Sequence, residues 1–164
     1  MKNFLLLFVF VSYSLAFAGE KIIPLPASTI VVVKTTNELN GAKLKAGQSI
    51  TCIVAMDVSV DDVVLVKAGT PVFCQVDAAE GSGMAGTAGN LSISIQYTTT
   101  VDGKNVMLTG NFVNKGESSV GETVAVSVIL CPLALLSSGD DAIIPAGTQI
   151  RAFTIGEVKV KIKE

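Results

Sequence analysis

The sequence predicts a mostly β protein, a small antiparallel β-barrel or sandwich with one apolar helix near residues 120–136. The first observation is a seven-residue phrase that reads apolar, Pro or Lys, Ala, Gly or Ser, Thr or Gln, any residue, apolar. Its four copies are Leu25–Val31, Leu44–Ile50, Val66–Val72 and Ile144–Ile150. The second observation is alternation of apolar and polar residues, which indicates half-buried strands. Together, corners and alternating strands favour a folded-over antiparallel sheet.

Each phrase predicts a bulged corner between two strands. Pro or Lys followed by Ala suits the two central positions of a type I turn. The fourth residue of the phrase then takes the left-handed conformation, which favours glycine. The residues expected at these structural turns are Ser28, Gly47, Gly69 and Gly147.

The first half of the chain is predicted to be extended throughout. Residues 20–26 form an extended lead-in, because Pro24 and Pro26 exclude helix. A polar turn follows at 37–41, and Asp61-Asp62 ends a long strand whose apolar face runs to Met56. The expected strands are 29–36, 49–60, 63–66 and 70–78.

The second half adds three strands and the helix. A glycine-rich loop at 81–90 precedes a strand over 91–99, and Asp102-Gly103 indicates a hairpin into a strand over 105–112. Leu91, Ile93, Ile95 and Tyr97 are expected on the buried face of the first of these strands. The apolar run over 120–136, which Pro132 bends or ends, is the expected helix. The last strand, 157–163, alternates Val158, Val160 and Ile162 with Lys159, Lys161 and Lys163.

The three cysteines have two interpretations. Cys52 and Cys74 both fall on the apolar face of their strands, and Cys131 lies in the apolar run. Free cysteine is among the most buried residue types, so packed thiols are the first interpretation. A Cys52–Cys74 disulfide across neighbouring strands is the second, because an exported protein enters an oxidising compartment. No Cys-x-x-Cys motif is present, which argues against a redox catalyst.

The composition excludes several classes of function. The chain has no His and no Trp, and its net charge is -2. Without His, Ser-His and Cys-His nucleophile pairs cannot form, and the commonest metal ligand is absent. Few aromatic and basic residues argue against nucleic acid as a partner. We therefore expect no catalytic residues, no cofactor and no metal.

Three further motifs carry weaker signals. Gly81-x-Gly83-x-x-Gly86 matches a dinucleotide fingerprint by letters, but the next predicted element is a strand and not the required helix. The acidic pairs Asp61-Asp62 and Asp140-Asp141 lack the spacing of a calcium loop. The C-terminal lysines suit either protection of an edge strand or contact with an acidic surface. Val124 to Leu136 either packs on the barrel or contacts a membrane or a subunit.

The N-terminus predicts export. Lys2, the apolar run 4–11 and the small-x-small site Ala16-Phe17-Ala18 indicate a signal peptide over residues 1–18. Residues 19–164 are then expected to form a single domain in the periplasm or cell envelope, or outside the cell.

The motifs together resemble a known family. They are Pro26-Ala27-Ser28-Thr29, Ala55-Met56-Asp57-Val58, the phrase at 66–72, Asp102-Gly103-Lys104 and Leu108-Thr109-Gly110. In this order they resemble the β-barrel domain of TrbI-like scaffold proteins of conjugation and type IV secretion, and small exported bacterial proteins of unassigned role that share its pattern. The resemblance spans residues 26–110. The long proline-rich stalk of the scaffold proteins is missing, and the apolar run is shorter than their membrane-crossing helical hairpin.

The resemblance implies a β-barrel and protein contacts in the envelope. We expect a non-catalytic exported scaffold or binding module, with an unknown protein partner and an oligomer as one option. One alternative is a carrier that holds a small apolar ligand in the barrel lumen. Another is a glycan hydrolase that uses paired carboxylates, which would need two acids facing each other across a cleft. Fold analogy alone does not decide among these functions.

Overall fold

A computed structural model describes residues 20–83, 87–116 and 139–163. Strands and turns make up this part of the chain, and it contains no helix long and apolar enough to cross a membrane. The strands are β1 (Glu20–Leu25), β2 (Ile30–Lys34), β3 (Leu39–Asn40), β4 (Ser49–Val54), β5 (Val58–Val60), β6 (Val63–Val66), β7 (Pro71–Glu80), β8 (Asn90–Thr99), β9 (Asn105–Thr109), β10 (Asn111–Lys115), β11 (Ile143–Ile144), β12 (Gln149–Thr154) and β13 (Val158–Lys163). The helix expected near 120–136 and the third cysteine, Cys131, lie outside the described residues.

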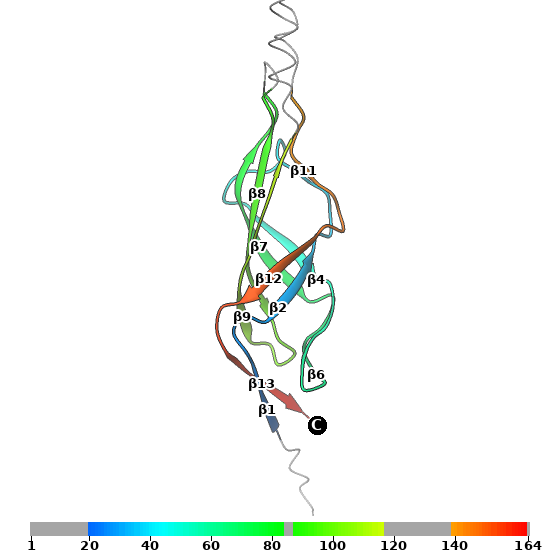
Figure 1. Cartoon of the computed structure of the whole chain (residues 1–164), viewed down its shortest axis with the longest axis vertical. Helices are drawn as coiled ribbons and strands as arrows, with labels where there is room; N and C mark the ends of the chain where they lie inside the picture. Colours follow the sequence, from blue (N-terminus) through cyan, green and yellow to red (C-terminus); the bar gives the residue numbers. More distant parts are fainter. Residues whose placement is uncertain (1–19, 84–86, 117–138, 164) are drawn as a thin grey trace, which may run out of the picture.

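The main sheet closes on itself. Strands β8, β7, β4, β2, β12 and β9 pair in this order, and β9 pairs again with β8. Every one of these pairs is antiparallel. The predicted antiparallel β-barrel is therefore confirmed, and the barrel rather than the sandwich is the form that the chain adopts. Figure 1 shows that β7 and β8 extend toward one end of the molecule, whereas β1, β13 and β6 lie at the other.

Smaller pairings complete the two ends of the barrel. Strands β1 and β13 form a two-stranded antiparallel ribbon, β5 and β6 form a hairpin, and β3 pairs with β11. The directly opposed residues of the ribbon put Ile23 beside Val160 and Leu25 beside Val158. Ile23, Leu25 and Val160 are buried, whereas Lys159 and Lys161 on the other face are exposed. The alternation of the C-terminal residues thus seals one end of the barrel.

Aliphatic side chains fill the interior of the barrel. Inward-facing residues alternate with outward-facing ones along each strand, as in any barrel. Buried residues that contribute to this core are Val31, Val33, Val54, Val72, Val76, Ile93, Val106 and Ala152. The aromatic side chains of Phe73, Tyr97 and Phe153 lie toward the outside of the barrel and not in its interior.

The four phrases form four corners with the same backbone. Gly47, Gly69 and Gly147 have φ of 82°, 81° and 86°, and Ser28 has φ of 61°. At each corner the N–H of this fourth residue donates to a strand carbonyl, and the partners are Thr154 for Ser28, Val76 for Gly47, Val54 for Gly69 and Thr35 for Gly147. A backbone hydrogen bond to the neighbouring strand therefore holds each corner, at or next to the end of that strand in three corners and within β7 at the Gly47 corner.

Three expectations for individual strands need correction. The strand predicted over 49–60 is wrong, because the chain bends at 55–57 and β5 pairs with β6 instead of continuing along the barrel. The Asp57 carboxylate accepts the N–H of Ala68 at 2.6 Å in this bend, and Met56 points outward. The strand predicted over 105–112 is interrupted at Gly110, where a Cβ would lie 2.9 Å from the carbonyl oxygen of Arg151.

The buried face predicted for Tyr97 is also wrong. The register between β7 and β8 shifts between Phe73 and Cys74, so the side-chain alternation of β8 changes phase near this point. Thr98 is buried in place of Tyr97 and donates its hydroxyl to the carbonyl of Pro71 at 2.8 Å. Tyr97 instead stacks on Phe73, with ring centroids 4.6 Å apart.

Candidate binding groove

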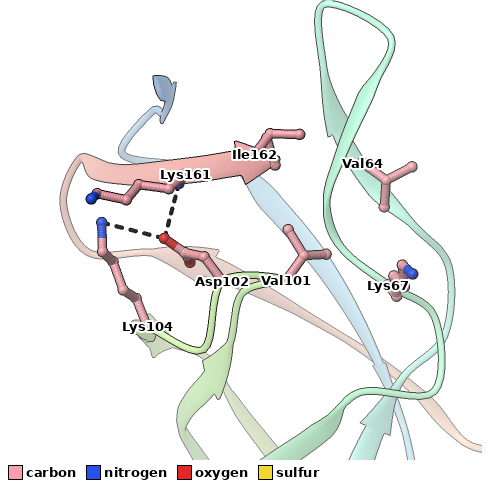
Figure 2. Close-up of a pocket in the computed structure, with 7 residues that line it drawn as sticks. All are labelled: Val64, Lys67, Val101, Asp102, Lys104, Lys161 and Ile162. Atoms are coloured by element: carbon pink, nitrogen blue, oxygen red, sulfur yellow. Dashed lines mark hydrogen bonds and ion pairs between the residues drawn. The ribbon is translucent and has the colours of Figure 1, made fainter. Parts of the chain in front are cut away.

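A groove of about 670 Å³ lies at the end of the barrel that the ribbon seals. Three elements enclose it: β13, the turn between β8 and β9, and the β5–β6 hairpin with the corner that follows it. Figure 2 shows the lining residues, which are Val64, Lys67, Val101, Asp102, Lys104, Lys161 and Ile162. We refer to this feature as the basic groove.

The β5–β6 hairpin forms one wall because its turn is tight. Asp61 and Asp62 have φ of 50° and 62°, and two consecutive positive φ values are the requirement of a type I′ hairpin turn. Asp tolerates this conformation better than most residues other than glycine. The acidic pair thus forms the turn that leads into β6, which carries Val64 and precedes Lys67.

The β8–β9 turn forms the second wall. Gly103 has φ of 82°, and its N–H donates to the carbonyl of Thr100 at 2.9 Å. The N–H of Lys104 donates to the Thr100 hydroxyl at 3.1 Å. This turn is the hairpin that Asp102-Gly103 predicts, and it places Val101, which is 41% exposed, together with Asp102 beside β13.

Asp102 connects the turn to the ribbon. One of its carboxylate oxygens accepts the backbone N–H of Lys161 at 2.9 Å and lies 3.3 Å from the ammonium of Lys104. The other accepts the Thr100 hydroxyl, while the Lys104 ammonium donates to the carbonyl of Lys159. The Asp102 side chain is only 10% exposed.

The protonation state of Asp102 follows from these contacts. Removal of the carboxyl from water would by itself raise its pKa, but the hydrogen bonds from Lys161 and Thr100 and the charge of Lys104 outweigh that effect. The pKa of Asp102 is lowered to about 2. The carboxylate therefore stays ionised and acts as a fixed acceptor at neutral pH.

The groove combines aliphatic and basic side chains. Val64, Val101 and Ile162 supply the aliphatic surface, and Lys67, Lys104 and Lys161 supply three positive charges. Among the described residues of the lining Asp102 alone is acidic, and it already binds within the chain. A basic groove in a chain of net charge -2 favours an anionic ligand over a cationic one.

The residues singled out from the sequence lie in different places. Gly69 belongs to the corner that carries Lys67, whereas Ser28, Gly47 and Gly147 belong to the other corners. Cys52 and Cys74 face the barrel interior, 1% and 2% exposed, and both are free thiols. The hydrogen bond from Cys74 lowers the pKa of Cys52, and the same contact together with burial raises the pKa of Cys74.

The sequence alone does not predict the groove. It indicates the alternating lysines of the last strand and the Asp102-Gly103 hairpin, but nothing in it indicates that they meet. Within the described residues, no three Cys, Asp or Glu side chains come together in a way that could hold a metal ion. In this part of the chain, the groove brings charged side chains, apolar side chains and backbone groups together.

Comparison with known proteins gives matches among solved structures alone. No family model and no curated protein matches the chain. Among solved structures, ComB10 of the Com type IV secretion system of Helicobacter pylori is similar over 86% of this chain and 92% of that chain, with 13% identity and a TM-score of 0.45. The β-barrel implied by the sequence resemblance is confirmed by the closed sheet, and membership of the TrbI-like family stays a prediction.

Proposed function

We propose that this protein is a non-catalytic, exported binding module or scaffold, and that the basic groove is a docking surface for a partner protein. The observation that carries the proposal is the groove itself, where three lysines and three aliphatic side chains line a hollow next to a strand edge. Protein interfaces combine apolar contacts with polar ones, and this groove offers both.

A second surface supports a scaffold with more than one neighbour. Outward-facing apolar side chains follow the barrel wall from β7 across β8, β9 and β12 to β2, because Phe73 opposes Tyr97, Tyr97 opposes Met107 and Phe153 opposes Ile30. The exposed members are Ile30, Phe73, Met107, Phe153 and Ile155. Contiguous exposed apolar side chains mark interaction sites more often than isolated ones do.

The filled interior favours this function over a carrier in the barrel lumen. Six strands enclose less space than the eight that just accommodate side chains or one small ligand. The inward valines and isoleucines of the core are buried against one another. A ligand would therefore bind on the outside of the barrel.

The positions of the acidic residues favour a binding role over carboxylate catalysis. Asp61 and Asp62 form a hairpin turn, and the Asp141 carboxylate accepts the N–H of Ser82 at 2.7 Å. Asp102 holds the ribbon and is ionised, whereas a general acid needs a raised pKa. The signal peptide predicted over residues 1–18 and the sequence resemblance to TrbI-like proteins support a location in the cell envelope.

Site-specific crosslinking in cells that make the protein tests the proposal. A photoreactive amino acid replaces Lys67 at the rim of the groove, and in the control it replaces Lys45. Both lysines are exposed, and both occupy the second position of the seven-residue corner phrase, where Ala and Gly follow. Lys45, however, lies outside the groove. We expect a discrete protein adduct from position 67 and none from position 45. Equal labelling at both positions, or no adduct at 67, would contradict the proposal.

A further inference from the structure

We infer that the partner enters the basic groove as an extended acidic segment, which adds along the outer edge of β13. This inference rests on the proposed function and specifies its ligand. It follows from three features of the groove: an edge of β13 that no described strand pairs with, side chains that take the place of a strand there, and the arrangement of apolar and basic groups beside it.

The edge of β13 that faces the groove is a strand edge without a strand partner among the described residues. β13 pairs with β1 on one side only, in a sheet of two strands. On the other side, the N–H of Lys161 and the carbonyl of Lys159 point toward the β8–β9 turn. An edge of this kind is a template for a further strand unless other groups cover it.

Asp102 and Lys104 cover this edge in the manner of a strand residue. In a parallel ladder, one residue of the partner strand donates to the carbonyl of residue i and accepts the N–H of residue i+2. Lys104 donates to the carbonyl of Lys159, and Asp102 accepts the N–H of Lys161 at 2.9 Å. Two side chains of opposite charge thus reproduce one backbone bridge. We infer that an incoming backbone replaces them, beginning at Lys104, whose side chain is 44% exposed.

The groove also selects the side chains of the segment. Successive side chains of an extended peptide point to opposite sides, so its two sides meet different surfaces. The lining offers both kinds of contact: the aliphatic side chains of Val64, Val101 and Ile162, and the ammonium groups of Lys67, Lys104 and Lys161. Alternating aliphatic and acidic residues satisfy both surfaces. An incoming carboxylate also offers Lys104 a new partner when Asp102 leaves.

A protein segment fits these features better than a lipid surface does. The carbonyl of Lys159 needs a donor and the N–H of Lys161 needs an acceptor, and a peptide backbone supplies both at the spacing of a strand. Anionic lipid headgroups would satisfy the lysines but would leave the carbonyl to Lys104. The aliphatic side chains of the lining and the strand edge together therefore point to β-strand addition.

The experiment measures binding of a seven-residue peptide of alternating Glu and Val, blocked at both ends and labelled for fluorescence anisotropy, to the purified protein. We expect saturable binding with chemical-shift changes at the amides of Val101, Lys104 and Lys161. A peptide with Lys in place of Glu should not bind. A peptide with Pro in place of the central Val should bind at least about tenfold more weakly, because Pro removes a ladder donor.

Three variants locate the site. Lys67→Glu should weaken binding about fivefold, since it replaces an attractive charge by a repulsive one at an exposed rim. The matched variant Lys45→Glu should leave the Kd unchanged within twofold. Asp102→Asn should strengthen binding about threefold, because it removes the negative charge that competes with the peptide while keeping an acceptor for Lys161. Thermal unfolding of each variant checks that it is folded.

Several outcomes would overturn the inference. Equal weakening by Lys45→Glu and Lys67→Glu, or undiminished binding of the proline peptide, would indicate a general charge effect. Preferential binding to phosphatidylglycerol vesicles through Lys67 would assign the groove to a membrane. If the crosslinker at position 67 traps a partner but the acidic peptide neither binds nor competes, the strand-addition inference fails and the docking function stands. If the crosslinker traps nothing, the docking function itself fails.

Discussion

Four of the six barrel strands form two pairs that use the same corner phrase with different side chains around it, and we call these pairs the proline half and the lysine half. The proline half consists of β2, β12 and the corners Leu25–Val31 and Ile144–Ile150. The lysine half consists of β4, β7 and the corners Leu44–Ile50 and Val66–Val72. In each half, two antiparallel strands pair, and the corner that begins each strand donates a backbone hydrogen bond to the other strand or to the residue that follows it. The two halves have the same pattern of backbone hydrogen bonds at their corners, so the phrase specifies the backbone conformation there.

The halves differ at the residue seven positions after the fourth residue of the phrase. This residue is Thr35 or Thr154 in the proline half and Val54 or Val76 in the lysine half. Thr154 donates its hydroxyl to the carbonyl of Pro26 at 2.7 Å and accepts the N–H of Thr29 at 2.9 Å. Thr35 makes the same two contacts with Pro145 and Thr148, at 2.8 and 3.0 Å. A buried hydroxyl thus reinforces each proline corner.

The largest expected effect tests the backbone that the two halves share. Gly147→Val and Gly69→Val should each lower the free energy of unfolding by about 1–3 kcal/mol, because a β-branched residue is strained at positive φ. Open space surrounds both positions, so the cost comes from the backbone conformation. Urea denaturation measures it, with Gly83→Val in the glycine-rich loop as control. A clear difference between Gly69 and Gly147 would show that the halves do not share one corner.

The next effect tests the hydroxyl that distinguishes the proline half. Thr154→Val should lower the free energy of unfolding by about 1–2 kcal/mol, since the part-buried Pro26 carbonyl and Thr29 N–H both lose a partner. Thr51→Val, on the exposed face of β4, is the matched control and should change stability by less than about 0.5 kcal/mol. If both variants unfold at the same urea concentration as the parent, the clamp contributes nothing.

Local patterns explain why much of the fold could be predicted. The corner phrases and the Asp102-Gly103 hairpin are short-range signals, and the alternation of the last strand depends only on neighbouring residues. The bulge that turns Tyr97 outward could not be predicted, because alternation alone does not reveal a one-residue shift between two strands. The bend at 55–57 could not be predicted either. Two consecutive aspartates fit the end of a strand as well as the tight turn through which β5 pairs with β6.

The groove depended on contacts that the sequence does not encode locally. Its residues come from β6 and the third corner, the β8–β9 turn and the last strand. The last strand, β13, reaches its place by pairing with β1 near the other end of the chain. The lysine alternation indicated an exposed face but not what it faces. The lysine alternation and the Asp102-Gly103 hairpin become parts of one site only through the hydrogen bond that the Lys161 N–H donates to the Asp102 carboxylate.

A smaller effect is expected from the thiols of the lysine half. Cys52 and Cys74 occupy the positions that Val33 and Ala152 occupy in the proline half, five residues after the fourth residue of the phrase. The double variant Cys52→Val, Cys74→Ala therefore transplants a natural pair of similar volume and should cost less than about 1 kcal/mol. A loss of several kcal/mol, with the mass of the native protein two hydrogens lower than that of the reduced form, would instead establish a Cys52–Cys74 disulfide.

The smallest expected effect comes from moving the clamp into the lysine half. In Val54→Thr the new hydroxyl would lie next to the corner that begins β7, because the N–H of Gly69 already donates to the carbonyl of Val54 at 2.8 Å. If the two halves are equivalent, the hydroxyl donates to the carbonyl of Lys67 as Thr154 donates to that of Pro26, and stability changes by less than about 0.5 kcal/mol. A buried hydroxyl without a partner would cost about 1–3 kcal/mol. Urea denaturation separates the two results, and the larger loss would show that the proline, and not the shared backbone, creates the acceptor site.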